Sequence, residues 1–495
     1  MRTSVRYLRG GKVRVIAAVD PSQTLLDHLR IDCRAIGTKE GCNEGDCGAC
    51  TVVLARLRDG VLVHEPVNSC ILLAGQVDGA EIITIEDLAR DGRLHPVQQA
   101  MVDHHGSQCG FCTPGIVMSL FALYQDGQRP VARATVADQL AGNLCRCTGY
   151  RPIFDAAKAV LASEAHDAFV LTQEARIAAL AGLADDEEDL FCGDEQRFFA
   201  APASVEALAT LYAAHSDAVL VGGATDVGLW ITKKLKDLPK VIWLGHVAGL
   251  DEVAHEGGRL HLGAGVTLGQ ATSHLAAIDP DLGEVMLRFG STQVRASGTV
   301  GGNIANGSPI GDLAPCLIAL GASVSLRRGE TIRDLPLEAF FIAYGKQDRQ
   351  PGEFVTALSV PDVGAACHFR AFKVSKRFDE DISAVMGAFQ SEIRDDAIAG
   401  ARIAFGGMAP TPRRAARTEM ALAGADLADP STWEAAIEAL GADYQPIDDM
   451  RASGAYRLST ARALLEKALF EISAAPTTMT RILGHREPVT GEVSA

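Results

Sequence analysis

Long apolar segments are what this chain most clearly lacks. Its 495 residues contain no apolar run of 18, the length that a membrane-spanning helix needs. The opening MRTSVRYLRGGKVRVIAAV has no apolar segment long enough for a secretory signal. Because the 12 cysteines occur without such a signal, they favour a reducing compartment and metal ligation over disulfides. We therefore expect a cytoplasmic protein with no membrane partner.

An excess of positive charge is missing as well. The chain has 62 acidic and 46 basic residues, a formal net charge of −16. A nucleic-acid-binding surface requires a basic patch, so we expect no nucleic-acid partner. The composition, 47% hydrophobic and 22% charged, is ordinary for a globular protein, and no internal repeat is visible. The length is too great for one core and predicts about two to four domains.

Three closely spaced cysteines dominate the N-terminal part. Cys42, Cys47 and Cys50 lie in KEGCNEGDCGACTV with the spacing C-x4-C-x2-C, which is typical of a plant-type [2Fe–2S] site. Cys70 is the first candidate for the fourth ligand. The intervening glycines suit a loop that wraps closely around a cluster and turns N–H groups towards its sulfurs. Zinc also accepts four thiolates, so a zinc-stabilised binding protein is the alternative.

Four further cysteines form a second set. Cys109 and Cys112 lie in QCGFCTPG, and Cys145 and Cys147 lie in GNLCRCTGYRPI. Helical patterns begin at His95, resume over residues 116–121 and return near residues 136–140, so each cysteine pair ends or begins a helix. The sequence therefore predicts a helical bundle that closes a second four-thiolate site.

The first 84 residues read mainly as strands. A hairpin is expected over residues 5–19 around Gly10-Gly11, a short helix over 24–29, and two strands at 51–55 and 60–63. A small mixed sheet with one helix and the cysteine loop at its edge indicates a ferredoxin-like module. Residues 160–196 are rich in Ala, Glu and Asp and read as an acidic linker or solvated helix.

The remainder alternates strand and helix patterns and carries two Gly-Gly pairs. Gly222-Gly223 follows a predicted strand at 218–221, and Gly301-Gly302 lies further on. Such glycine-rich turns bring backbone N–H groups close to phosphate oxygens, although a single Gly-Gly pair is usually just an ordinary tight turn. The segment 263–269 departs from the Rossmann fingerprint and is interpreted as a strand-to-helix turn. Strands are expected at 384–389 and 398–405.

Several single residues have two interpretations. Asp312 could bind a ribose hydroxyl or cap a helix that begins at Leu313. Lys373 could place a cation beside a bound group, where it would stabilise negative charge, or it could belong to a solvated basic turn. Four cysteines lack partner spacing and are expected to be buried, unliganded thiols: Cys33, Cys192, Cys316 and Cys367.

Together these motifs resemble the xanthine dehydrogenase and aldehyde oxidase family of molybdenum hydroxylases. VLVGGATDVG at 219–228 and GSTQVRASGTVGGNIANGSPIGDLAP at 290–315 are similar to the FAD domain of that family. The resemblance implies a multidomain α+β chain with the following parts: a β-grasp ferredoxin-like [2Fe–2S] domain at 1–84, a helical [2Fe–2S] domain at 85–165, an acidic linker at 166–195, an α+β FAD-binding domain of the non-Rossmann vanillyl-alcohol-oxidase type at 196–365, a C-terminal α+β flavoprotein domain at 366–476, and a tail at 477–495.

The resemblance also implies ligand sets. Cys42, Cys47, Cys50 and Cys70 would hold one cluster, and Cys109, Cys112, Cys145 and Cys147 the other. The FAD-contact positions would be Leu220, Val221, Gly222, Gly223, Ala224, Thr225, Asp226, Val227, Phe289, Thr299, Asn303, Asp312, Val355 and Lys373. Ala224 stands where the family often has asparagine, so it can offer only its backbone.

The implied function is electron transfer in a xanthine dehydrogenase. A large partner subunit would carry molybdopterin and oxidise hypoxanthine and xanthine to urate, in an α2β2 heterotetramer. Electrons would enter at the second cluster, pass through the first to FAD and leave on NAD⁺, with no side chain of this chain acting as a catalytic acid or base. An aldehyde or another heteroaromatic substrate on the partner is the alternative.

Overall fold

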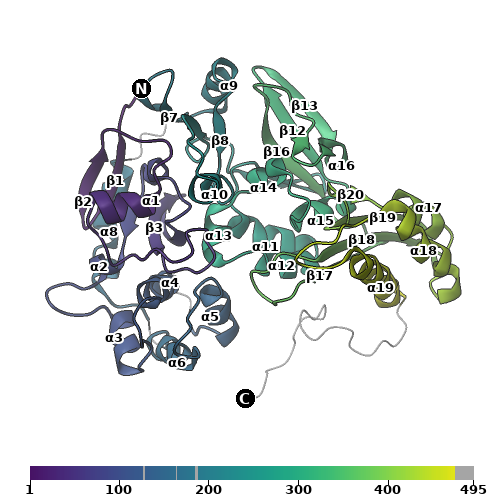
Figure 1. Ribbon diagram of the computed structural model, residues 1–495, viewed down its shortest axis with the longest axis horizontal. Coiled ribbons are helices and arrows are strands. Elements are labelled where there is room, and N and C mark those ends of the chain that lie inside the picture. Colours follow the sequence, from purple (N-terminus) through teal and green to yellow (C-terminus); the bar gives the residue numbers. More distant parts are fainter. Residues whose placement is uncertain (126–128, 163, 184–187, 474–495) are drawn as a thin grey trace. The chain divides into compact units, whose positions relative to one another are not determined.

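The chain folds into two compact units. The computed structural model describes residues 1–125, 129–162, 164–183 and 188–473 (Figure 1). Of the described residues, those in Met1–Leu250 and Gly290–Thr299 form the first unit, and Asp251–Phe289 with residues 300–473 form the second. The predicted tail at 477–495 lies outside the described residues. The multidomain α+β organisation expected from the sequence is confirmed.

The first unit begins with a five-stranded sheet (Figure 1). Its strand order is β2 (Lys12–Ile16), β1 (Val5–Arg9), β5 (Glu81–Ile83), β3 (Thr51–Arg58) and β4 (Val61–Asn68). β1 and β2 form the predicted hairpin, and β1 pairs with β5 in parallel. The predicted helix at 24–29 is shorter: α1 (Leu25–Asp27) passes into a π-helical turn (His28–Asp32).

Helices follow this sheet as predicted. α2 (Ile85–Leu88) precedes α3 (Pro96–Asp103), α4 (Thr113–Gln125), α5 (Arg133–Leu140) and α6 (Arg151–Val160). Nearly every side chain of α4 is buried, because α4 packs against β3 as well as against α3 and α5. The helix therefore joins the sheet and the bundle in one core, in which Phe121 is fully buried.

The segment expected to be an acidic linker contains two packed helices. These are α7 (Ala168–Leu171) and α8 (Gln173–Ala181). On α8, Arg176 is buried and donates hydrogen bonds to Glu81 (2.7 Å) and to the His64 ring (3.1 Å). α8 is therefore docked on the sheet and is not a solvated helix. Residues 185–187 of the acidic run lie outside the described part of the chain.

A second, four-stranded sheet completes the first unit. Its order is β6 (Leu190–Gly193), β7 (Phe198–Ala201), β9 (Lys240–Trp243) and β8 (Val219–Val221). β7, β9 and β8 are parallel, and β6 pairs antiparallel with β7. α9 (Val205–Ala214) and α10 (Val227–Thr232) accompany these strands, and α13 (Thr292–Ser297) comes from the later segment. The strand predicted at 218–221 is thus confirmed as β8.

The second unit contains another five-stranded sheet. Its order is β10 (Val253–Glu256), β11 (Arg259–Gly263), β16 (Phe354–Pro361), β12 (Ser323–Arg328) and β13 (Thr331–Pro336). The accompanying elements are α11 (Leu268–Ile278), α12 (Pro280–Leu287), α14 (Val300–Asn306), α15 (Leu313–Leu320), α16 (Leu337–Phe340), β14 (Phe341–Ala343) and β15 (Lys346–Gln347). The predicted strand-to-helix turn at 263–269 joins β11 to α11, where Thr267 and Gln270 form a capping box.

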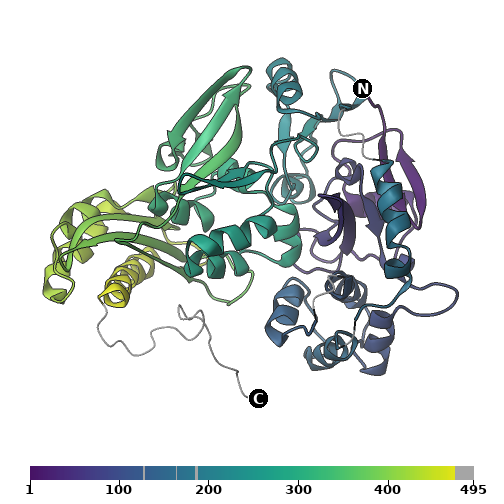
Figure 2. The same cartoon turned by 180° about the vertical axis from the view of Figure 1, so that it is seen from behind.

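The C-terminal segment forms a four-stranded antiparallel sheet (Figure 2). β17 (Cys367–Val374), β18 (Val385–Arg394), β19 (Ala397–Gly406) and β20 (Arg413–Arg414) follow one another in chain order. β18 and β19 contain the two predicted strands. α15 packs on β18 and β19, and α17 (Ala416–Leu422), α18 (Glu434–Asp443) and α19 (Gly454–Ile472) complete the layer.

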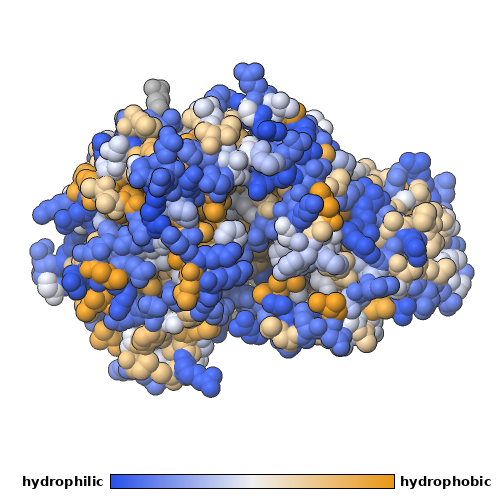
Figure 3. Space-filling view, turned by 45° about the horizontal axis from the view of Figure 1, so that its top comes forward, coloured by the Kyte–Doolittle hydropathy of each residue, from blue (hydrophilic) through white to orange (hydrophobic). Residues whose placement is uncertain are grey.

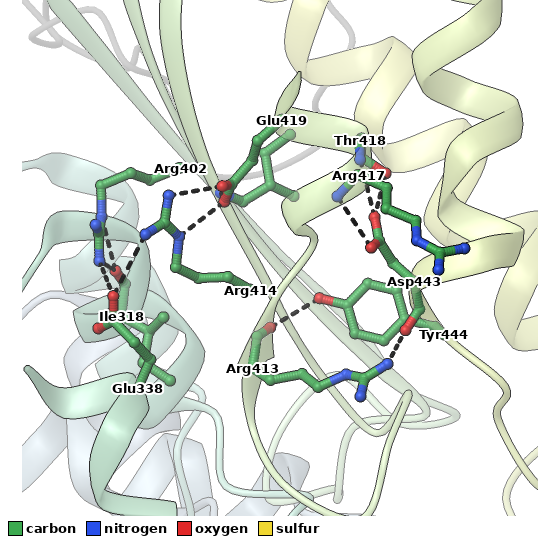
Figure 4. Close-up of polar contacts among 11 residues, drawn as sticks. Ile318, Glu338, Arg402, Arg413, Arg414, Arg417, Thr418, Glu419, Asp443 and Tyr444 are labelled. Atoms are coloured by element: carbon green, nitrogen blue, oxygen red, sulfur yellow. Dashed lines mark hydrogen bonds and ion pairs between the residues drawn. The ribbon is translucent and has the colours of Figure 1, made fainter. Parts of the chain in front are cut away.

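Charged side chains hydrogen-bond α17 to the sheet and to α18 (Figure 4). Glu419 of α17 accepts hydrogen bonds from the Ile403 backbone (2.7 Å) and from Arg414 (2.6 Å). Asp443, at the end of α18, accepts from the backbone N–H groups of Arg417 (3.1 Å) and Thr418 (2.9 Å). These bonds satisfy N–H groups in the first turn of α17, which have no partner within the helix.

The face shown in Figure 3 is mostly hydrophilic, with small separate hydrophobic patches. In the part of the chain that the structure describes, no helix is both long enough and apolar enough to cross a bilayer.

Candidate cofactor sites

The first cysteine loop brings its predicted ligands together. Cys42 is a hydrogen-bonding neighbour of Cys47 and of Cys70, and Cys50 is a neighbour of Cys70. These thiol contacts lower the pKa of Cys42 and raise the pKa of Cys47 and Cys70. One thiol of such a group therefore ionises readily in the absence of a metal, which is the form that binds iron.

Backbone donors surround the same sulfurs. The Cys42 sulfur accepts from the N–H groups of Asp46 (3.4 Å) and Cys47 (3.3 Å), and the Cys47 sulfur accepts from the Cys42 N–H (3.3 Å). Gly45 has φ +78°, and a Cβ at Gly41 would lie 2.7 Å from the Cys47 sulfur. The loop thus offers thiolates and N–H donors to an anionic cluster, and it fits a [2Fe–2S] group.

The second cysteine set is also assembled, but close to solvent. Cys109 contacts Cys147, and Cys112 contacts Cys145. Cys109 and Cys147 are exposed, whereas Cys112 and Cys145 are partly buried. Burial opposes ionisation of Cys145, but hydrogen bonding to Thr148, whose hydroxyl lies 3.2 Å from the sulfur, lowers its pKa. This set fits a cluster near the protein surface.

Among the described residues, no group of three or more His, Cys, Asp or Glu side chains is arranged to hold a single metal ion. In each set all four thiols nevertheless have a thiol neighbour from the same set. A [2Fe–2S] cluster has two iron atoms, each of which takes two protein thiolates, so it requires four thiols that lie close together.

The two cysteine loops are hydrogen-bonded to each other. The N–H of Leu144, beside Cys145, donates to the carbonyl of Cys47 (3.0 Å). The Asn143 amide donates to the Gly48 carbonyl (3.2 Å). A Cβ at Gly48 would lie 2.1 Å from the Gly142 oxygen, and one at Gly115 would lie 2.0 Å from the Gly48 oxygen. The glycines are therefore required by the direct approach of one loop to the other.

The chain around Cys70, the predicted fourth ligand, contacts the segment that contains the predicted flavin residues 220–227 and the start of the helix that follows it. A Cβ at Gly228, the residue after that segment, would lie 2.3 Å from the carbonyl oxygen of Ile71, the neighbour of Cys70. The Gln76 amide donates to the Gly222 carbonyl (2.9 Å). The first ligand set is thus in contact with the second cysteine set through Cys47 and with the predicted flavin segment through the residues after Cys70.

The predicted flavin residues of the first unit form one strand-to-helix turn. Leu220 and Val221 end β8, and the segment Gly222, Gly223, Ala224, Thr225, Asp226 and Val227 leads into α10. A Cβ at Gly223 would lie 1.8 Å from the Ser297 oxygen, and one at Gly222 would lie 2.6 Å from the Thr299 hydroxyl. Ala224 has φ +59°, so its turn is unusual for a residue with a side chain.

The predicted flavin residues of the second unit centre on a buried ion pair. Lys373 of β17 contacts Asp312 at 2.5 Å, and both side chains are almost fully buried. Ser383 donates to the other Asp312 oxygen (2.5 Å). Asp312 precedes α15 but makes no side-chain cap bond, so its geometry does not support the cap interpretation. Lys373 is not part of a solvated turn.

Three further predicted residues lie in this unit. Asn303 of α14 is 3.9 Å from the position of a Cβ at Gly311, next to Asp312. Phe289 follows Arg288, whose guanidinium donates to the Lys373 carbonyl (3.3 Å). Val355 is buried on β16 opposite Leu326. The contact of each of these residues with FAD stays a prediction.

Two expectations were wrong. Gly301-Gly302 lies within helix α14 and forms no turn, and the Gly301 N–H donates to the Ala264 carbonyl (3.0 Å), so it is not available to a phosphate. Cys192 and Cys316 are buried as predicted, but Cys33 and Cys367 are partly exposed.

Comparison with known proteins gives matches along most of the chain. Residues 10–74 match a 2Fe-2S iron-sulfur cluster binding domain, and residues 84–158 match a [2Fe-2S] binding domain. Residues 194–363 match the FAD binding domain in molybdopterin dehydrogenase, and residues 370–472 match the CO dehydrogenase flavoprotein C-terminal domain. Xanthine dehydrogenase of Emericella nidulans is 32% identical over 88% of this chain, and that of Drosophila subobscura is 33% identical over 92%.

The chain belongs to the xanthine dehydrogenase family. It spans 36% and 38% of the length of those two relatives. Among solved structures, carbon monoxide dehydrogenase from Hydrogenophaga pseudoflava has a chain that is similar with a TM-score of 0.52 and 26% identity, over 55% of this chain and 95% of that chain. Two [2Fe–2S]-binding domains and an FAD-binding domain are thus established for this member of the family.

Sequence reasoning missed residues that support these sites. Ser383 holds Asp312 from 71 positions away, and Asn143 and Gly115 determine how closely the two cysteine loops approach. Gly115 lies in the motif QCGFCTPG, so its position beside a ligand was the available signal. Nothing in the sequence near Ser383 marks it.

Proposed function

We propose that this chain is the electron-transfer subunit of a xanthine dehydrogenase. A separate large subunit would carry molybdopterin and oxidise hypoxanthine and xanthine to urate, and NAD⁺ would accept the electrons here. When bound, the [2Fe–2S] clusters carry single electrons, and FAD stores two and passes them on as a hydride. An α2β2 assembly and a cytoplasmic location complete the proposal.

The central position of the first cysteine loop carries this proposal. Its backbone bonds to Leu144 beside Cys145, and Ile71 beside Cys70 packs against Gly228 after the flavin loop. A continuous path of covalent bonds, one hydrogen bond and a packing contact therefore runs from the second cysteine set through the first cysteine set to the predicted flavin segment. The chain's own contribution is to hold the cofactors in that order, and it needs no catalytic acid or base.

The surroundings of the second cysteine set support electron entry there. Cys109 and Cys147 are exposed, and Phe111 and Leu144 beside them expose 48% and 45% of their surface. Exposed apolar residues around an exposed cluster suit contact with another subunit. An aldehyde or N-heterocycle substrate on the partner remains the second candidate, since quinoline 2-oxidoreductase from Pseudomonas putida, which is named for an N-heterocycle, is among the similar solved structures.

Cys147→Ser tests the proposed electron path. In the complex with the molybdenum subunit, we expect the variant to lose one [2Fe–2S] electron paramagnetic resonance (EPR) signal and at least about a hundredfold in NADH formation, because one cluster would lack a ligand. Reduction of molybdenum by xanthine should persist. Cys367→Ser is the matched control and should retain NADH formation. Unchanged NADH formation in Cys147→Ser would exclude the path.

A further inference from the structure

Four chemically active side chains meet in the first unit away from all the sites described above. His28 Nδ1 lies 2.9 Å from the Asp32 carboxylate, and His28 Nε2 lies 3.5 Å from the Cys33 sulfur. The Tyr7 hydroxyl lies 3.0 Å from the same Nε2 and 3.6 Å from the sulfur. None of these residues belongs to the proposed cluster or flavin sets.

An irregular turn creates this arrangement. The Cys33 N–H donates to the His28 carbonyl (2.9 Å) across a π-helical turn, and Arg34 then has φ +57°. In a regular helix, residues five apart would point to different faces. The wider π turn, a feature often found at functional sites, instead brings Cys33 and Asp32 to the same imidazole.

The imidazole is oriented for proton transfer. Its Nδ1–H can donate to Asp32, and Asp32 is itself held by the Gln23 amide (2.9 Å). Nε2 then faces both the Tyr7 hydroxyl and the Cys33 sulfur, so it can accept the Cys33 thiol proton while the Tyr7 O–H donates to the resulting thiolate. Base, orienting carboxylate and nucleophile thus have the relationship that activates cysteines in enzymes.

We propose that Cys33 is a nucleophilic thiol that exchanges with low-molecular-weight disulfides and is thereby reversibly S-thiolated. His28 takes the thiol proton, and the Cys33 sulfur attacks one sulfur of the reagent. The disulfide bond of the reagent breaks as the Cys33–reagent bond forms. The other half leaves as a thiolate and is protonated from solvent, so Cys33 is oxidised and the reagent is reduced.

Charges around the group favour the ionised thiol. Hydrogen bonding to His28 lowers the pKa of Cys33 in spite of burial, with further help from Tyr7 and from Arg9 of β1. Contacts with Cys33 and Asp32 raise the pKa of His28 against the effect of its burial. Arg14 of β2 adds positive charge near Tyr7. Cys33 is also partly exposed, so a small reagent can reach it.

The test compares two cysteines of one molecule. Cys367 is partly exposed, like Cys33, and lies at the start of β17 opposite Glu392, outside the cluster around His28. The full chain with its cofactors is treated with 4,4′-dithiodipyridine from pH 5.5 to 9, and labelling of each cysteine is followed by peptide mass spectrometry. We expect Cys33 to react about tenfold faster than Cys367 at pH 7, because the rate of each thiol increases with pH and the increase for Cys33 should occur at a lower pH than that for Cys367.

Asp32→Asn separates the proposal from simple exposure. The Asp32 side chain is 47% exposed, so the variant should fold, and we expect a fall of about threefold to tenfold in the Cys33 rate because the imidazolium loses its partner. Asp59→Asn removes the same charge at an exposed turn and should change nothing. Equal rates for Cys33 and Cys367, or an unchanged rate in Asp32→Asn, would overturn the proposal.

Discussion

His64 shows how one residue can make folding depend on pH. It lies on β4, 3.1 Å from the Arg176 guanidinium, and its ring centroid is 6.1 Å from that of Phe121. Burial first, and then the charge of Arg176, lower the pKa of His64 to about 3. In the unfolded chain this pKa is about 6.5. Between these two pKa values the unfolded state binds a proton at His64 that the folded state does not bind. The free energy of unfolding therefore decreases as the pH falls below 6.5.

His64→Gln should remove part of this pH dependence. A difference of one pKa unit corresponds to about 1.4 kcal/mol, so between pH 7 and pH 5 the wild-type chain should lose about 2 kcal/mol that the variant retains. Thermal unfolding midpoints measured across this range test the expectation. His255→Gln is the control, since the His255 side chain is 59% exposed. Parallel curves for wild type and His64→Gln would contradict it.

At the scale of elements, the two cysteine loops and helix α4 approach one another so closely that only glycine fits at the contact. Gly48 in the first cysteine loop faces the Gly142 oxygen, and Gly115 of α4 faces the Gly48 oxygen. The bond from Leu144 to Cys47 depends on this approach. A single added methyl group must therefore push the loops apart or distort them, because backbone atoms cannot rotate away as side chains do.

Gly48→Ala should weaken communication between the two clusters. We expect both clusters to assemble, with iron content near wild type, but electron exchange between them to slow at least about tenfold, because the hydrogen-bonded contact is lengthened. Gly60→Ala is the control: Gly60 has φ +76°, similar to the +67° of Gly48, but nothing lies within 4 Å of its added Cβ. Freeze-quench EPR measures the exchange. Equal rates in the two variants would show that the approach is unimportant.

At the scale of the whole molecule, the sequence predicted local features better than distant contacts. The hairpin around Gly10-Gly11 and the cysteine sets were predictable because turn residues and ligand spacing are local signals. The pairing of Ser383 with Asp312 was not, since it joins residues 71 positions apart. The π-helical turn that unites His28 with Cys33 was also missed, because residues 24–29 carry an ordinary helical pattern.

Anaerobic reduction by NADH tests the central claim most directly. The claim is that this chain holds two [2Fe–2S] clusters and FAD and connects them to one another. We predict about four iron atoms and one flavin per chain, a brown protein whose visible absorption NADH bleaches, and two distinct [2Fe–2S] EPR signals in the reduced sample. A colourless protein that contains zinc, or one whose clusters stay oxidised when NADH is added, would contradict it.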